Sequence, residues 1–146
     1  MKQNIPLKPT ALINIKKIDD NVGEIAGRFW KNIWNKDNPA VDLKTKLLLS
    51  MSNAVGSGRF RQASRELIKA YSLGVTIDVL DELFALFIWN QGIGHFASEI
   101  GPSQFFKIYK TIKELENKKI ERKEIVESIM ESFGENNPQV GTNYKS

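Results

Sequence analysis

The chain has 146 residues and a net charge of +4, with 41% hydrophobic and 26% charged residues, values typical of a single soluble globular domain. The absence of cysteine excludes disulfides, thiolate metal sites and thiol catalysis. Lysines alternate with glutamates, as in KTIKELENKKIERKE, which argues against a nucleic-acid-binding face. No apolar run approaches the roughly 18 residues of a membrane span. The first residues lack the apolar stretch of a secretion signal, so we expect a cytoplasmic location.

Residues 1–18 are expected to form an extended arm, because two prolines fall within the first ten positions. A first helix is predicted over about 19–35, capped by Asp19 or Asp20. Its apolar residues recur at steps of three and four: Val22, Ile25, Ala26, Phe29, Trp30, Ile33 and Trp34. So wide a stripe predicts a core or a subunit interface. The alternative is an aromatic cage for a ligand.

Three further helices are predicted across the middle of the chain, over about 42–55, 59–72 and 77–91. The first of these ends at Gly56–Gly58 and the second at Gly74, while Thr76 caps the third. Every position from Leu83 to Trp89 in the third is apolar. This pattern predicts either a central helix or one that a neighbouring subunit covers.

Two more long helices are predicted in the last third of the chain, one from Ser103 and one over about 121–133. A short helix or loop at 95–100 precedes them. Residues 134–146 are expected to be a flexible tail. Because no segment shows the alternation of a strand, the sequence predicts an all-α, single-domain bundle of about six helices. The helical domain then covers 19–133.

The most specific pattern lies between about residues 44 and 92. It reads LKTKLLLSMSNAVGSGRF, then RQASRELIKAYSLGVT, then IDVLDELFALFIWNQG. The pattern consists, in this order, of an apolar helix, a small-residue turn, an amphipathic helix, a Gly74-Val75-Thr76 corner, and a helix that is first acidic and then apolar. This order resembles the carboxymuconolactone decarboxylase and alkylhydroperoxidase D-like family, over about 44–116 and more weakly over 20–43. The resemblance implies an alkylhydroperoxidase D-like fold and a homotrimer or homohexamer.

The reactive residues of that family do not carry over. Many members work through two cysteines, a glutamate and a histidine. The resemblance places the cysteine positions at Arg59 and Gln62, the histidine position at Glu66 or Arg65, and the glutamate position near Lys46. A thiol peroxidase is therefore excluded, because disulfide cycling needs a thiolate. The missing histidine also argues against a lactone decarboxylase, and we expect no cofactor.

A relocated acid–base site is the remaining catalytic hypothesis. His95 is the one histidine of the chain and follows two glycines beyond the apolar helix. We predict that it lines a cavity with Glu66 and Glu99, between the two helices that flank the Gly74 corner. Such groups would shift each other's pKa out of water. In the alternative interpretation, His95 caps a helix or bonds a carbonyl in the core.

Arg61, Arg65 and Lys69 form a cationic row at four-residue spacing, which predicts a site for a small anionic molecule or, alternatively, a solvated helix face. Arg65 and Trp89 are the predicted substrate contacts. Two functions then compete. One is a cysteine-free family member with an altered small-molecule pocket and acid–base chemistry of decarboxylase or lyase type. The other is a non-catalytic structural or interaction protein that keeps the oligomeric scaffold.

Overall fold

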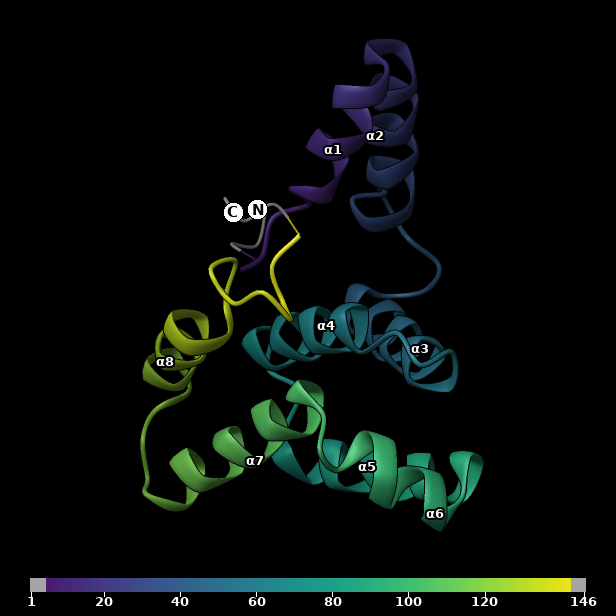
Figure 1. Ribbon diagram of the computed structural model, residues 1–146. Helices are drawn as coiled ribbons and strands as arrows, with labels where there is room; N and C mark the ends of the chain where they lie inside the picture. The colour runs from purple at the N-terminus through teal and green to yellow at the C-terminus, as the bar shows by residue number, and fades with distance from the viewer. Residues whose placement is uncertain (1–4, 143–146) are drawn as a thin grey trace.

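The computed structural model describes residues 5–142. Within this range the chain forms eight α-helices and one π-helical turn, with no strand. A hairpin of α1 (Ala11–Ile18) and α2 (Asp20–Trp34) projects from a body that contains all the other helices (Figure 1). The predicted all-helical class is confirmed, whereas the predicted number of six helices is wrong, because residues 11–18 form a helix and the segment predicted as a short helix or loop at 95–100 is helical and begins with the short α6.

The body is built around α4. Its elements are α3 (Leu43–Gly56), α4 (Phe60–Ser72), α5 (Ile77–Gln91), α6 (Ile93–His95), the π-helical turn η1 (Phe96–Ile100), α7 (Gln104–Asn117) and α8 (Arg122–Phe133). Helix α4 packs against α3, α7 and α8. Gly58 and Gly74 follow α3 and α4 with φ angles of +69° and +104°, which L side chains rarely adopt. Glycine is therefore favoured at both turns.

Side-chain caps explain why the helix starts could be predicted. Each of four helices begins after a residue whose side-chain oxygen accepts a hydrogen bond from the backbone N–H three positions on: Asp19 for α2, Asp42 for α3, Thr76 for α5 and Ser103 for α7. These bonds satisfy amides that the first helical turn leaves without a partner. The predicted starts of these four helices consequently agree with the structure to within one residue.

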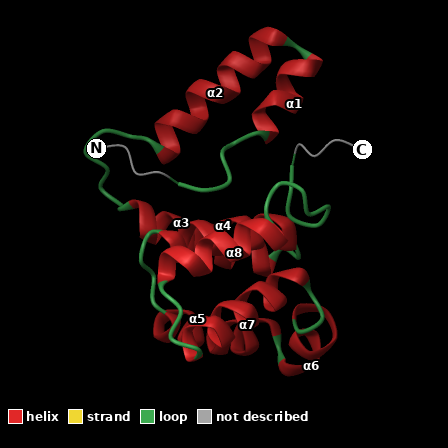
Figure 2. Cartoon of the chain, turned by 90° about the vertical axis from the view of Figure 1, so that its left-hand side faces the viewer, coloured by secondary structure: helices red, strands yellow, loops and turns green. Residues whose placement is uncertain are grey.

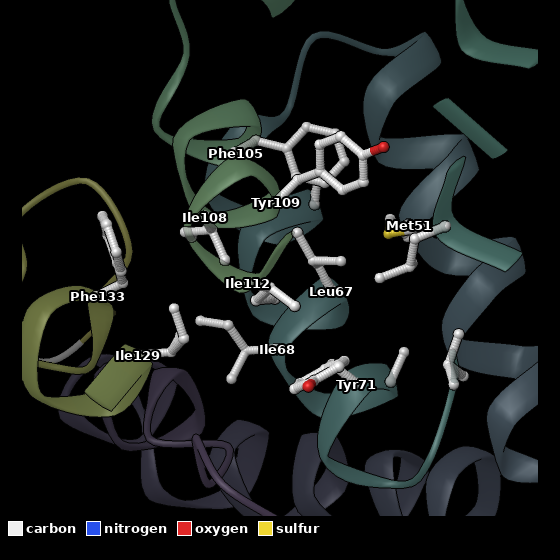
Figure 3. Close-up of a cluster of buried hydrophobic side chains, with 14 of the residues drawn as sticks. Met51, Leu67, Ile68, Tyr71, Phe105, Ile108, Tyr109, Ile112, Ile129 and Phe133 are labelled. Carbon is white, nitrogen blue, oxygen red and sulfur yellow. The ribbon is translucent and has the colours of Figure 1, made fainter. Parts of the chain in front are cut away.

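The hydrophobic core lies in the body. Figure 3 shows large side chains of α3, α4, α7 and α8 gathered around Leu67 and Ile68, which are almost completely buried. Phe84 of α5 stacks on Phe105 and Tyr109 of α7, with ring centroids 5.0 Å and 4.1 Å apart. Neither helix of the hairpin contributes a fully buried residue. The core therefore lies in the body, and α2 reaches its edge through the partly buried Trp34.

Both ends of the chain differ from the prediction. Residues 11–18 form α1 rather than an extended arm, because both prolines precede this segment and it packs against α2. The expected flexible tail folds back over α4 as far as Thr142, and Val140 within it is fully buried. Residues 143–146 of that tail lie outside the described part of the chain.

Helix α5 is not the central helix that its sequence allowed. Phe84 and Phe87 are buried, but Leu86 is half-exposed and Trp89 is 84% exposed. The apolar surplus of α5 therefore faces outward from the single chain. The other interpretation of this segment, coverage by a neighbouring subunit, stays a prediction.

Candidate functional site

The predicted acid–base residues do not come together. His95 lies on α6, which packs against α5 and η1 at the end of the body opposite the hairpin (Figures 1 and 2). His95 and Glu99 are exposed, whereas Glu66 is buried in α4. The glycine at position 92 does turn the chain, with φ +90°, but the turn leads outward, since Ile93 is exposed as well. The predicted shared cavity of these three residues is therefore wrong for the described chain.

Glu66 makes a different contact from the predicted one. Its Oε1 atom accepts a hydrogen bond from Lys69 Nζ one turn later, at 3.2 Å. Its Oε2 atom is buried and has no hydrogen-bond partner among the described residues. A buried carboxylate is costly unless a cation compensates it. Lys69 supplies that cation, so Glu66 fixes the position of the Lys69 ammonium group.

Arg65 is occupied by the protein itself. Its guanidinium donates hydrogen bonds to a carboxylate oxygen of Glu135 at 2.6 Å and to the carbonyls of Val140 and Lys8, each at 3.1 Å. These bonds hold both ends of the described chain against α4. Arg61 likewise donates to the carbonyls of Pro138 and Gly141. The prediction that Arg65 contacts substrate is thus replaced by a structural role.

We call these contacts of Arg65 with Glu135, Val140 and Lys8 the Arg65 clasp. They also set the pKa of Glu135. Burial raises the pKa of its carboxyl group, but the N–H of Thr142 and the guanidinium of Arg65 lower it by more. The net effect is a pKa below the ordinary value of 4.5. Glu135 is therefore ionised near neutral pH and pairs with Arg65.

Trp89, the other predicted substrate contact, does not wall a site within the described chain. It lies near the end of α5 with 84% of its surface exposed. Val79 and Leu86 of α5 and Ile93 of α6 are also exposed, and we call these three residues and Trp89 the α5 face. All four side chains are at least 41% exposed.

A second apolar surface runs along the hairpin. We call it the hairpin seam, and it consists of Ile18, Val22, Ile25, Phe29 and Ile33. These five side chains are between 38% and 86% exposed, although all are large and apolar. The sequence had assigned most of this stripe to a core or an interface. Within the described chain it does not contribute to the core.

The hairpin is held to the body at its base. Lys46 Nζ of α3 donates a hydrogen bond to the Ile33 carbonyl at the end of α2, at 2.8 Å. At the start of α1, the hydroxyls of Thr10 and Thr142 are 2.9 Å apart, and Asn14 Nδ2 donates to the Thr142 carbonyl. The far end of the hairpin, around Ile18, points away from the body (Figure 2). No other part of the described chain therefore covers most of the seam.

An open cavity of about 770 Å³ lies at this base. Trp30 and Trp34, one turn apart on α2, line one part of it, and Leu43 and Leu47 of α3 line another. Four lysines and one aspartate complete the charged lining: Lys8, Lys31, Lys36, Lys69 and Asp37. Sequence patterns found the tryptophans but could not find this combination, because it joins α4 to segments more than thirty residues earlier in the chain.

The described residues contain no cluster of three or more histidine, aspartate or glutamate side chains arranged to hold a metal ion. In the same part of the chain, every helix is too short or too polar to cross a membrane. Comparison of the sequence with protein-family models and with curated proteins, and of the structure with solved structures, found no match. The family resemblance therefore remains a prediction.

Proposed function

We propose that this chain is a non-catalytic interaction protein that assembles with copies of itself through the α1–α2 hairpin. The observation that carries this proposal is the open hairpin seam. Helices of 8 and 15 residues with no fully buried side chain form a marginal unit in water. A partner that covers the seam would stabilise the hairpin by removing its apolar surface from water.

The spacing of the seam suits another helix as the partner. Val22, Ile25, Phe29 and Ile33 lie on one helix, α2, and are separated by three, four and four residues, a spacing that places them along one face of the helix. Two helical hairpins that place such seams together form a four-helix bundle. In a symmetric pair, the same surface of both copies meets, so the seam of one copy would pack against the seam of the other. A second copy's hairpin is therefore the occupant that we propose.

The α5 face supports assembly beyond a single pair. A closed ring of three subunits needs one repeated interface, whereas two stacked rings need a second and different one. The chain carries two separate apolar surfaces, the hairpin seam and the α5 face, in different parts of the molecule. We propose that the assembly is a dimer when the hairpin seam alone is used, and a hexamer of three such pairs when the α5 face closes a ring of three as well.

Light scattering on the eluting peak of a sizing column tests this proposal. We expect a mass that is a multiple of 16.6 kDa. The double variant I25E/F29E should reduce that mass, because it places carboxylates in the seam. The matched control is Glu24→Lys, which changes a charge on the polar side of the same helix and should leave the mass unchanged. A wild-type monomer at tens of micromolar would contradict the proposal.

The second candidate function is binding of a small molecule in a pocket, and the cavity at the hairpin base favours it. Its volume of about 770 Å³ is within the range of small-molecule sites. We propose no acid–base reaction there, since the predicted catalytic groups are elsewhere: His95 and Glu99 lie at the body's surface, and Glu66 is engaged by Lys69. The cavity therefore supports binding of a small molecule without a reaction.

A further inference from the structure

We propose that the cavity at the hairpin base binds an organic anion with a flat apolar body, such as an aromatic carboxylate. This inference rests on the second candidate function and not on self-assembly. The cavity is lined by five segments of one chain: the lead-in to α1, the end of α2, the loop to α3, α3 and α4. It therefore exists without a second copy.

The apolar part of the lining selects the body of the ligand. Trp30 and Trp34 are partly buried, and they are four residues apart on α2, so their rings lie one turn apart on one side of the helix. Leu43 and Leu47 of α3 add an aliphatic surface. Indole faces and aliphatic side chains bind flat apolar groups through burial and stacking. An inorganic anion would leave this surface in contact with water.

The charged part of the lining selects the sign of the ligand. Lys8, Lys31 and Lys36 come from three different segments, and none of them forms an ion pair among the described residues. Asp37 is the one acidic residue of the lining. Three unpaired ammonium groups around a partly enclosed space attract an anion more strongly than the same groups on an open surface.

Lys69 gives the site one fixed cation. Its side chain is only 18% exposed, and its ammonium group is held by Glu66 from within α4. The other lysines are exposed, and their ammonium groups can move toward a ligand. A cation that is already positioned lowers the entropy cost of binding a carboxylate. Lys69 therefore orients the ligand, while Lys8, Lys31 and Lys36 add attraction.

Calorimetric titration with 4-tert-butylbenzoate tests the proposal, and tryptophan fluorescence locates the binding. The background for fluorescence is Trp89→Phe, because this variant leaves only Trp30 and Trp34 of the chain's three tryptophans. We expect saturable binding of the benzoate with a change in emission. The neutral 4-tert-butylbenzamide should bind at least about tenfold more weakly, a loss of about 1.4 kcal/mol, because it lacks the negative charge that the ammonium groups attract. Acetate, which lacks the apolar body, should not bind measurably.

Lysine variants show whether the binding uses this cavity. The double variant K31Q/K36Q should weaken benzoate binding about five- to tenfold, whereas Lys107→Gln, an exposed lysine of α7, should not change it. Equal affinity for benzoate and benzamide, an equal effect of the two lysine variants, or no binding at millimolar benzoate would each overturn the inference.

The seam variant I25E/F29E separates this inference from the assembly proposal, because neither residue lines the cavity. Benzoate binding that persists in this variant supports the cavity whatever the oligomeric state. An intact wild-type oligomer that does not bind benzoate overturns the cavity alone. A wild-type monomer that does bind it overturns self-assembly alone.

Discussion

Helices α2 and α4 have similar lengths and similarly amphipathic sequences, yet they end in opposite surroundings. Eight residues of α4 are buried, whereas none of α2 is. Helix α4 packs against three long helices of its own chain, and α2 packs mainly against the eight-residue α1. The apolar stripe of a helix thus indicates how much apolar surface needs to be buried. Whether a packing partner is available depends on the rest of the chain. For α2 we propose that the partner is another copy.

The largest expected effect comes from truncating one phenylalanine in each region. Phe84 is buried in the aromatic stack of the body, so Phe84→Ala should lower the free energy of unfolding by about 3–5 kcal/mol. Phe29, in the hairpin seam, is 68% exposed. Phe29→Ala should therefore change the stability of an isolated subunit by less than about 0.5 kcal/mol.

Urea denaturation at several protein concentrations measures both effects. In an oligomer, the Phe29→Ala effect should grow with protein concentration, because assembly stabilises the folded chain by mass action. The Phe84→Ala effect should be similar at every concentration. Equal losses at low concentration would contradict the difference that we draw between hairpin and body.

The clasp around Arg65 should give the next largest effect, since it joins the body to the segments that flank the hairpin. Replacing Arg65 by Met leaves Glu135 and two carbonyls without their donor. We expect a loss of about 2–3 kcal/mol, below the usual value for a broken buried pair because Glu135 is 30% exposed. Lys123→Met, at an exposed position of α8, is the matched control and should be nearly neutral. A loss under about 1 kcal/mol for Arg65→Met would show that the clasp is not important.

The same clasp predicts a dependence of stability on pH. The pKa of Glu135 is lower in the folded protein than its ordinary value of 4.5, so its ionisation stabilises the fold at higher pH. This contribution is complete above about pH 4.5 and is lost as the pH falls through the folded pKa. Arg65→Met should remove part of this dependence. Thermal unfolding of both proteins between pH 3 and 7 should therefore show a smaller difference at the acidic end, and a constant difference would contradict it.

Local signals predicted much of the body. Asp42 and Ser103 are capping residues placed just before apolar periods, and Gly74 occupies a turn that requires positive φ, so these helix ends could be found from the sequence. The long-range contacts could not be predicted. Nothing near Arg65 in the sequence indicates that it binds Glu135, seventy residues later, or the carbonyl of Lys8.

The candidate site failed for the same reason. Its residues were placed together by resemblance to a family, and the exposure of His95 depends on the direction in which the chain leaves Gly92. That direction is set by the packing of α6 on α5 and η1, which local patterns do not contain. The tryptophans of the hairpin-base cavity were predicted as an apolar stripe. Their lysine neighbours were not, because they come from segments that meet only in the folded chain.

The smallest expected effect distinguishes the two glycines of α2 and tests how closely the hairpin is packed. A Cβ atom at Gly23 would lie 2.8 Å from Lys16 Cα, a backbone atom of α1, whereas a Cβ atom at Gly27 would meet nothing within 4 Å. Alanine is favoured over glycine inside a helix by about 1 kcal/mol. Gly27→Ala should therefore stabilise α2 by up to about 1 kcal/mol. Gly23→Ala should lose this gain, because α1 must move away from α2.

Hydrogen exchange in α1 measures this difference better than global unfolding does, since the body sets the global stability. Amides of α1 should exchange several-fold faster in Gly23→Ala and no faster in Gly27→Ala, while α4 should exchange alike in both proteins. Unchanged exchange of α1 in Gly23→Ala would mean that the two helices are not held in contact at this position. The hairpin would then be two loosely associated helices, and its seam would require a partner to form at all.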